Sequence, residues 1–463
     1  MGGTMTRLGS ILLASVAATM VAGATRAADL PPLAADPAAA KVRAKQVAEW
    51  RKTYGEGPYP DEVEAFVATH KEPLRPYYKS LYTGGERNAV LNLSRLGLAA
   101  MELGHWTDAE HAFDAALLRI EAVYSRNKSA EAARSLWHKE SNKDWKGEPY
   151  ERAMAYYYRG LLYLRKGDYN NAHASFKDAE FQDTISESET FQSDFALMNY
   201  LVGWSAQCAG DNGATDFAEA MKAQKALAAP AAADNVLLIA ELGHGPVKVR
   251  DGRVREKMVF HAAEGFPETG AIFTLTPGKG APLRYDGRIA SSVYYQATTR
   301  GGRAMDGIMN GKASFKSTTG AIGAGGIQLG TQMMQQDVGA GLTVALAGAL
   351  FAGLSSMTKT DADIRMWDSL PDGIALATGR AAGPFKPTVT FTTDQGSIAV
   401  PPTPVMQASV GKCAIVWTRS RSAVVDAETP GDDPKVRATV ARKKDVQLKD
   451  KNFRVALATD FKD

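Results

Sequence analysis

Few residues in this sequence of 463 have the types and the spacing that protein chemistry requires. Only two of the seven histidines, His105 and His111, lie close together, and a separation of six residues is not typical of metal ligands. The segment Gly307–Ala313 contains Lys312, but it is one residue short of a phosphate-binding loop and lacks the Ser or Thr that follows the lysine. Gly323–Gly326 lacks the third glycine of a dinucleotide-binding motif. The sequence therefore predicts no catalytic residue, no metal site and no cofactor.

The two cysteines, Cys208 and Cys413, leave two alternatives open. A disulfide between them would join two distant regions of the chain, whereas two half-buried free thiols fit the sequence equally well. A disulfide requires Cα atoms within about 7 Å of each other, and sequence does not give that distance. Two cysteines do exclude a disulfide-rich scaffold and a cysteine-rich zinc module.

The charge balance excludes a general affinity for nucleic acid. The chain has 54 Lys and Arg residues against 51 Asp and Glu, a net charge of +3, and 45% of its residues are hydrophobic. Such a balance creates no strong field for a polyanion, and the hydrophobic content is that of a folded chain. The length corresponds to two or three domains of ordinary size.

The N-terminus has the pattern of an export signal. Arg7 is followed by the apolar run Leu8–Ala24 and then by small residues where a signal peptidase requires them. We expect cleavage after Ala27 and a periplasmic or exported protein, with an uncleaved N-terminal anchor as the alternative. Removal of residues 1–27 lowers the net charge from +3 to +1. No cysteine lies near the cut, so lipid attachment at a processed N-terminus is excluded.

Residues 41–225 show the spacing of paired helices joined by short polar turns. Two segments place small and aromatic residues at matching offsets from a turn glycine, Gly104 in one and Gly167 in the other. These positions are Leu96, Gly97, Trp106, Ala109, Phe113, Ala116 and Leu117 in the first segment and Tyr156, Gly160, Tyr163, Tyr169, Ala172, Phe176 and Ala179 in the second. The pattern is typical of the tetratricopeptide repeat, a helix–turn–helix unit of about 34 residues. A third, weaker unit is expected from Met198 to Ala220.

The small and aromatic positions also predict how each pair packs. We expect Gly97 and Gly160 to let the two helices of a pair approach closely, because glycine has no side chain to separate them. Phe113 and Phe176 are then expected to fill the space toward the next repeat.

A cluster of tyrosines lies on the first helix of the second unit. We predict that Tyr156, Tyr157 and Tyr163 bind a partner in the concave groove of the stack, because aromatic side chains supply large contact areas. The alternative is that some of these tyrosines, together with Tyr158, belong to the core, since three consecutive residues cannot share one face of a helix.

Beyond residue 234 the pattern changes to short strands separated by turns. The expected strands are Val236–Ala240, Pro246–Arg250, Met258–Phe260, Ala271–Leu275, Ser292–Tyr295, Ile374–Thr378, Thr388–Thr392, Ser397–Val400 and Ala414–Trp417. Val236–Val249 is expected to form a hairpin. We predict a small β-rich domain that is split by an insertion.

The insertion, Gly320–Met357, contains a single charged residue, Asp337. Its core, Val338–Leu354, has 17 uncharged residues, the short limit for a bilayer span. Small residues recur every four positions and predict a helix-packing face. They are Gly341, Ala345, Ala349 and Gly353. A buried helical hairpin, a membrane-inserted or oligomerising hairpin and a flexible loop remain alternatives.

Several segments together resemble a known family. They are Lys146–Arg152, Tyr156–Gly160, Leu164–Ala172, Gly245–Lys248 and Ala362–Pro371, the last with the pattern Arg-x-Trp-x-x-Leu-Pro. Over roughly residues 75–400 the chain resembles exported bacterial tetratricopeptide-repeat proteins, which are mostly lipoproteins. The resemblance implies a periplasmic, envelope-associated role and no enzymatic activity. The lipid-accepting cysteine of that family is missing here, which argues against tethering by that route and leaves residues 338–354 as the remaining candidate for a membrane anchor.

The residues of the last segment also have a structural interpretation. Trp367 is suited to cover a strand edge, while Leu370 and Pro371 turn the chain into the strand that begins at Ile374. We expect Arg365, Trp367 and Pro371 to form a junction between domains more than a binding site.

Taken together, the sequence predicts an α+β protein with an N-terminal helical repeat domain and a β-rich domain that a Gly/Ala-rich helical hairpin interrupts. The expected parts are a signal peptide (1–27), a helical cap (28–72), the repeat domain (73–229), the β-rich domain in two parts (235–319 and 358–422) around the insertion (320–357), and a charged tail (423–463). The expected function is a non-enzymatic envelope scaffold that binds a partner protein in its groove. The alternatives are an envelope hydrolase or regulator whose site forms only on folding, and a membrane-associated oligomer.

Overall fold

The structure, a computed structural model, describes most of the chain. The described residues are 37–54, 57–121, 144–183, 194–251, 257–299, 362–398 and 405–461. The chain divides into two compact units, Met1–Trp50 and Arg51–Asp463. Helix α1 (Pro37–Tyr54) begins in the first unit, and the elements after it belong to the second. The expected signal peptide (1–27) and the insertion (320–357), with Gly341, Ala345, Ala349 and Gly353, lie outside the described residues.

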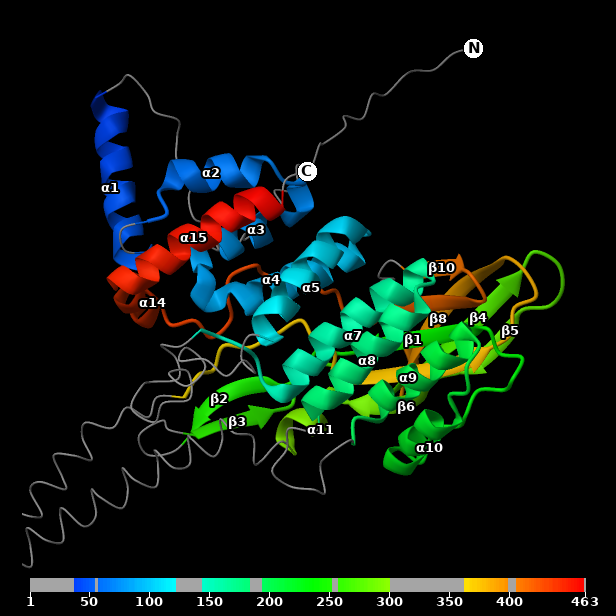
Figure 1. Cartoon of the computed structure of the whole chain (residues 1–463). Helices are drawn as coiled ribbons and strands as arrows, with labels where there is room; N and C mark the ends of the chain where they lie inside the picture. The colour runs from blue at the N-terminus through cyan, green and yellow to red at the C-terminus, as the bar shows by residue number, and fades with distance from the viewer. Residues whose placement is uncertain are drawn as a thin grey trace, which may run out of the picture. The chain divides into compact units, whose positions relative to one another are not determined.

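The second unit begins with a run of helices (Figure 1). They are α2 (Pro60–Ala68), η1 (Glu72–Leu74), α3 (Arg75–Gly84), η2 (Glu86–Asn88), α4 (Ala89–Glu102), α5 (Trp106–Glu121), α7 (Pro149–Lys166), α8 (Tyr169–Asp183), α9 (Ala196–Ala209) and α10 (Ala214–Ala223).

Strands dominate the rest of the unit, which confirms the α+β class. They are β1 (Val236–Leu242), β2 (Val247–Asp251), β3 (Lys257–His261), β4 (Gly270–Pro277), β5 (Leu283–Asp286), β6 (Arg288–Ser292), β7 (Gly373–Gly379), β8 (Phe385–Thr393), β9 (Gly396–Ile398), β10 (Met406–Val410) and β11 (Cys413–Arg419). Among the described residues they are accompanied by helices α11 (Val293–Thr298), α14 (Pro434–Ala441) and α15 (Lys444–Asp460).

Helices α4–α5, α7–α8 and α9–α10 form three successive hairpins with the same internal contact. The predicted turn glycines Gly104 and Gly167 have φ angles of 74° and 73°, in the left-handed region that glycine adopts without strain. A Cβ atom on Gly97 of α4 would lie 2.9 Å from the ring of Phe113 on α5. Gly160 meets Phe176 in the second hairpin, and Gly203 meets Phe217 in the third.

The expected role of the two phenylalanines needs one correction. Phe113 and Phe176 lie against the glycine of their own hairpin, where the missing side chain leaves room for a ring. Phe113 also reaches the next hairpin, since its ring centroid lies 5.8 Å from that of Tyr158.

The central sheet has the strand order β10-β11-β1-β7-β6. Strands β1 and β11 run parallel, with Leu238 opposite Val416, and the other neighbours are antiparallel. All seven residues of β1 and all seven of β11 are buried. Both strands are therefore covered on both faces, as continuous apolar runs require.

Two layers cover the central sheet. Leu237 and Ile239 of β1 face the core that contains the helices, while Val236 and Leu238 face a second sheet with the order β5-β4-β8-β9. Phe273 of β4 is fully buried in that second core. In Figure 1 the hairpins α7–α8 and α9–α10 lie on one side of β1.

Two of the strand predictions are wrong. The expected hairpin Val236–Val249 does not form, because β1 pairs with β7 and β11 while β2 pairs with β3. A strand buried on both faces takes its partners from wherever the fold supplies them, and here both come from later in the chain. The expected strand Ser292–Tyr295 is instead the start of α11, because the Ser292 hydroxyl caps the helix and accepts from the Tyr295 N–H at 3.1 Å.

Residues 423–463, expected only as a charged tail, contain helices α14 and α15. Phe453, Leu457 and Phe461 of this region are buried. The Phe461 ring contacts Tyr78 of α3 and His111 of α5, with ring centroids 5.8 and 6.2 Å away. The C-terminal region is therefore part of the helical core. In the part of the chain that the structure describes, no helix is both long enough and apolar enough to span a bilayer.

Candidate functional site: the helical groove and its strap

Residues 362–372, which we call the strap, lie against the inner side of helices α4 and α7. Trp367 is their central side chain and is only 2% exposed. Its ring centroid lies 5.6 Å from Tyr158 of α7 and 6.3 Å from Phe113 of α5. The Trp367 backbone N–H donates to Glu151 Oε1 at 2.9 Å, and its indole N–H donates to Ser369 Oγ at 3.1 Å. We keep the name groove for the side of the hairpins lined by α4 and α7, where a partner was expected to bind. The strap, a segment of the same chain, covers this side.

Arg365 anchors the strap to the start of α4. Its guanidinium is 1% exposed and forms an ion pair with Asp363 at 2.6 Å. It also donates to Asn88 Oδ1 at 2.8 Å and to the Arg87 carbonyl at 3.1 Å. Burial by itself raises the pKa of Asp363, but the neighbouring Arg365 outweighs it and holds that pKa below its usual value. A buried charge is tolerated here because each of its polar groups has a partner.

Glu151 and Lys248 hold the strap from a second side. The Lys248 ammonium on β2 lies 2.6 Å from Glu151 Oε2 and donates to the Arg365 carbonyl at 3.1 Å. The Trp145 indole N–H donates to the same carbonyl at 3.0 Å. Glu151 also accepts from the Glu148 N–H at the start of α7. One carboxylate therefore contacts the N-terminus of a helix, a strand and the strap. Burial raises the pKa of Glu151, and Lys248 opposes that rise.

A third cluster joins the strap to the central sheet. The Glu241 carboxylate on β1 accepts from the Trp417 indole at 2.9 Å, from the Tyr158 hydroxyl at 3.0 Å and from Arg419. Arg419 of β11 also donates to the Ser369 carbonyl at 2.5 Å. Burial raises the pKa of Glu241, and the positive charge of Arg419 works against it. These groups connect α7, the sheet and the strap in one buried network.

Residues 420–433 run along the groove beside the strap. Arg95 of α4 pairs with Asp368 at 3.0 Å and donates to the carbonyls of Ala427 and Glu428 at 3.0 and 2.8 Å. Arg87 pairs with Asp432 at 2.5 Å. The Tyr77 hydroxyl donates to the carbonyl of residue 425 at 2.8 Å, and burial raises the pKa of Tyr77 to about 12. Two segments from late in the chain thus occupy the inner side of the hairpins.

The predicted partner-binding tyrosines do not form an open surface in this conformation. Tyr156 and Tyr157 are 4% and 0% exposed, and only Tyr163 is half-buried, with the Arg159 guanidinium 3.8 Å from its ring centroid. Tyr158 is buried as well. Three consecutive tyrosines are buried because α7 is enclosed by α5, α8, α11 and the sheet strands β10 and β11. Tyr156, Tyr157 and Tyr158 belong to the core, the alternative that the sequence left open, and Tyr163 lies at its edge.

Sequence reasoning found Arg365 and Trp367 but missed the charged groups that hold them. Glu151 and Lys248 are 97 residues apart, and Glu241 and Arg419 are 178 apart. In sequence such residues resemble solvent-exposed charges, which is where most charges lie. A local signal existed only for Glu151, which follows Glu148 and Pro149 in the pattern of a helix N-terminus.

The structure decides between the two alternatives for the cysteines, a disulfide or two free thiols. Cys208 at the end of α9 and Cys413 at the start of β11 form a disulfide, with Cα atoms 5.8 Å apart. The Tyr169 hydroxyl lies beside it, accepting from the Cys413 N–H at 2.9 Å and donating to the Val410 carbonyl at 2.7 Å. A polar surface hollow next to the bond is lined by residues of the hairpin turns and of the β10–β11 turn, among them Asp168, Asp211 and Lys412. The disulfide fastens the helical layer to the sheet.

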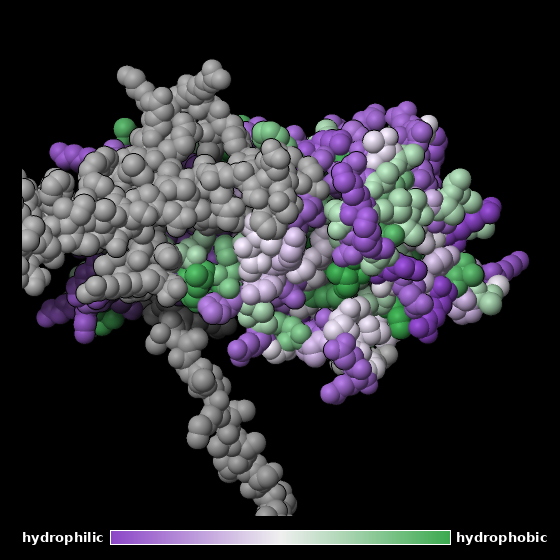
Figure 2. Space-filling view, turned by 90° about the horizontal axis from the view of Figure 1, so that it is seen from below, coloured by the Kyte–Doolittle hydropathy of each residue, from purple (hydrophilic) through white to green (hydrophobic). Residues whose placement is uncertain are grey.

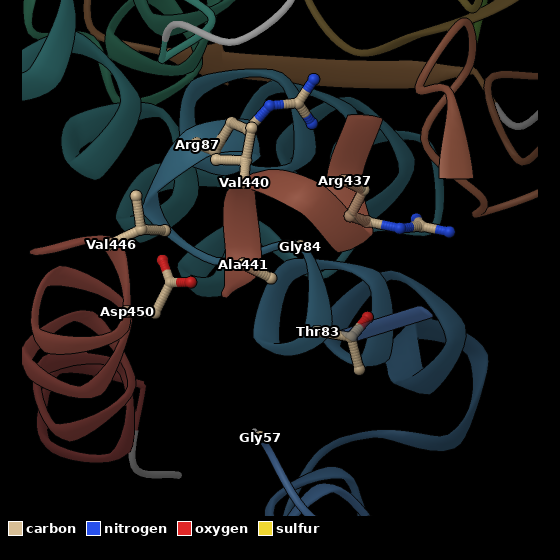
Figure 3. Close-up of a pocket in the computed structure, with 9 residues that line it drawn as sticks. All are labelled: Gly57, Thr83, Gly84, Arg87, Arg437, Val440, Ala441, Val446 and Asp450. Atoms are coloured by element: carbon tan, nitrogen blue, oxygen red, sulfur yellow. The ribbon is translucent and has the colours of Figure 1, made fainter. Parts of the chain in front are cut away.

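A second, smaller hollow lies between α3, α14 and α15 (Figure 3). Thr83, Gly84, Arg437, Val440 and Asp450 line it. Asp450 accepts from the Glu86 N–H at 2.9 Å, and burial raises its pKa. Among the described residues no group of three His, Cys, Asp or Glu side chains is placed to hold a metal ion. Hydrophobic side chains on the face seen in Figure 2 form small areas between hydrophilic ones.

Comparison with known proteins leaves the family assignment open. No family model matches the chain, and no curated protein or solved structure matches it significantly. The resemblance to exported tetratricopeptide-repeat proteins therefore stays an expectation from sequence.

Proposed function

We propose that the protein is a non-enzymatic scaffold of the cell envelope whose tetratricopeptide-like hairpins bind a partner protein. The observation that carries the proposal is the repetition of one helix–helix contact, Gly97 with Phe113, Gly160 with Phe176 and Gly203 with Phe217, in three successive hairpins. Stacks of such units present extended surfaces, which is the usual reason for their use as binding scaffolds.

The strap changes where the partner is expected to bind. Opening the groove would separate Arg365 from Asp363 and Lys248 from Glu151, and would leave buried charges without partners. The second helices of the hairpins stay accessible. The side chains of Asp114 on α5 and Lys177 on α8 are 52% and 44% exposed. We assign the partner to this outer surface in place of the groove.

The compartment is part of the same proposal. A disulfide between Cys208 and Cys413 is expected to persist in an oxidising environment, such as the periplasm, and to be reduced in the cytosol. It therefore supports the expectation of an exported protein that the N-terminal sequence raised.

Site-specific photo-crosslinking in intact cells tests the proposal. A photoreactive residue replaces Asp114 or Lys177 on the outer surface, and exposed Lys279, in the turn after β4, serves as the control position. We expect the same crosslinked protein at Asp114 and Lys177 and none at Lys279. If a partner were captured only by a photoreactive residue in place of Asp368 of the strap, the partner would bind in the groove and not on the outer surface. Turnover of an envelope substrate without a captured partner would favour the hydrolase alternative.

A further inference from the structure

The C-terminal helices concentrate positive charge in a protein that is otherwise nearly neutral. Residues 434–460 contain eight Lys or Arg against three Asp. The whole chain has 54 basic and 51 acidic residues, so this short segment holds a local excess larger than the net charge of +3. Electrostatic attraction depends on such local excess more than on the total.

Most of these cations are exposed and form no ion pair with another described residue. Lys435, Arg442, Lys443, Lys444 and Lys451 are exposed, and none forms an ion pair within the ranges that the structure describes. Lys449 lies 3.6 Å from Asp144, but its side chain is 57% exposed. We call these six residues the basic surface.

Helix α15 presents the basic surface in a fixed orientation. On its inner side, Asp450 accepts from the Glu86 N–H at 2.9 Å, the Arg119 guanidinium lies 5.1 Å from the ring centroid of Phe453, and Leu457 is buried. Because these contacts hold the inner side of α15 against the rest of the unit, its outer side always faces away from it. Local helix stability does not explain its charges, because Lys443 and Lys444 stand at the N-terminus of α15, where the helix dipole disfavours cations.

Two apolar side chains stand among the cations. Leu448 and Val455 of α15 are 61% and 62% exposed. Lys444, Leu448, Lys451 and Val455 follow at intervals of four, three and four residues and so share one face of α15. On such a face the lysines can contact lipid phosphates while the aliphatic side chains between them enter the layer just below the headgroups.

We propose that the basic surface docks the protein on an anionic phospholipid membrane. Its Lys and Arg side chains contact the lipid phosphates, while Leu448 and Val455 enter the boundary between headgroups and acyl chains. None of the six residues lines either of the two hollows described above, so no pocket presents them to a peptide, which favours a lipid surface over an acidic protein. This inference is independent of the partner proposed for the hairpins.

Vesicle sedimentation tests it with the chain from Ala28 onward, which retains every described residue. The probes are vesicles of phosphatidylcholine alone and of phosphatidylcholine with one quarter phosphatidylglycerol. We expect binding only to the anionic vesicles. The triple variant Arg442→Gln, Lys443→Gln, Lys444→Gln should bind about a hundred-fold more weakly, since each basic residue near such a surface contributes about five-fold.

Three matched substitutions elsewhere provide the control. Lys222→Gln, Lys225→Gln and Lys279→Gln remove the same charge from other exposed positions and should leave binding within about two-fold, because these residues lie outside the basic surface. Leu448→Ser with Val455→Ser should weaken binding without changing its salt dependence. Any contribution of residues 338–354 to vesicle binding is the same in all variants, so it does not affect the comparison between them.

Several outcomes would overturn the proposal. They are equal binding to both vesicle types, no binding to either, and equal losses in the two triple variants. Binding of a polyglutamate peptide without vesicle binding would assign the basic surface to an acidic protein instead. Circular dichroism and the unfolding midpoint of each variant separate these outcomes from loss of the fold.

Discussion

Lysine and arginine have opposite surroundings in two regions of this protein. In the groove, Arg95, Arg365, Arg419 and Lys248 are each no more than 3% exposed, and each meets a carboxylate. On the basic surface of α14 and α15 the same residue types are exposed, and among the described residues only Lys449 forms an ion pair. The cations of the groove hold segments from distant parts of the chain together. The cations of the basic surface make no such internal contact and are accessible to an external ligand.

The difference shows why net charge alone said little about function. The balance of 54 basic and 51 acidic residues hides a buried set that is neutralised internally and an exposed set that is not. Only the exposed set acts at a distance, because buried charges are already compensated by their partners. Substitutions in the two regions should therefore have different consequences, and the largest are expected in the groove.

Replacing Arg365 with Met should have the largest effect. The change leaves the partly exposed Asp363 carboxylate beside an apolar side chain and removes the hydrogen bonds to Asn88 and Arg87, which should cost about 3 kcal/mol of unfolding free energy, the low end for breaking a buried pair. Urea denaturation measures this loss. The double variant Asp363→Asn, Arg365→Met should recover part of this loss. If Arg365→Met alone lost less than about 1 kcal/mol, the buried ion pair would contribute no more to stability than a surface ion pair does.

Gly160→Ala tests the packing of the helical layer with an expected loss of about 1–3 kcal/mol. The new Cβ would collide with the Phe176 ring, which lies directly over Gly160. Gly278→Ala is the control, because nothing lies within 4 Å of a Cβ at that turn position. Equal unfolding free energies for the two variants would contradict the close approach of α7 and α8.

The pH dependence of stability should depend on Asp363. Its folded pKa is held below the ordinary value of 3.8, so its contribution is present above that value and is lost as the pH falls through the folded pKa. Asp363→Asn should therefore be clearly less stable than the parent at neutral pH, with the gap narrowing below about pH 4. Unfolding curves at several pH values measure the gap, and a constant difference down to about pH 2 would refute this role.

Arg442→Gln, Lys443→Gln, Lys444→Gln should have the smallest effect on stability, within about 0.5 kcal/mol of the parent. These side chains are exposed and form no ion pair among the described residues, so their removal costs no buried contact. Urea denaturation of this triple variant beside Arg365→Met gives the contrast directly. A loss comparable with that of Arg365→Met would mean that the basic surface is structural.

The local features of the fold could be predicted from sequence. Turn glycines Gly104 and Gly167, and the Gly97 and Gly160 contact positions, are set by spacing within a single hairpin. The strand predicted at Val236–Ala240 follows from its apolar run, and the structure extends it to Leu242. Each of these hairpin contacts joins residues 16 positions apart within one helix–turn–helix unit, so a pattern in the sequence is enough.

The long-range features could not be predicted in the same way. Sequence does not show that β1 pairs with β11, because no turn connects them and their register depends on the whole sheet. Tyr157 is buried only because α7 is surrounded by other elements. The ion pair of Lys248 with Glu151 combines two residues that look solvent-exposed in isolation. The candidate site consists almost entirely of such distant contacts, and only Arg365 and Trp367 were foreseen.

The position of β1 in the sheet has a consequence for how the chain is made. Glu241 of β1 and Trp417 of β11 are 176 residues apart, so a ribosome completes this apolar strand long before its parallel neighbour exists. The hairpins before it rest on local contacts and form early, whereas β1 has two unpaired edges until β7 and β11 arrive. During this interval the nascent chain exposes an aggregation-prone segment. Shielding residues 236–242 until β7 and β11 have been synthesised is therefore expected to raise the yield of folded protein.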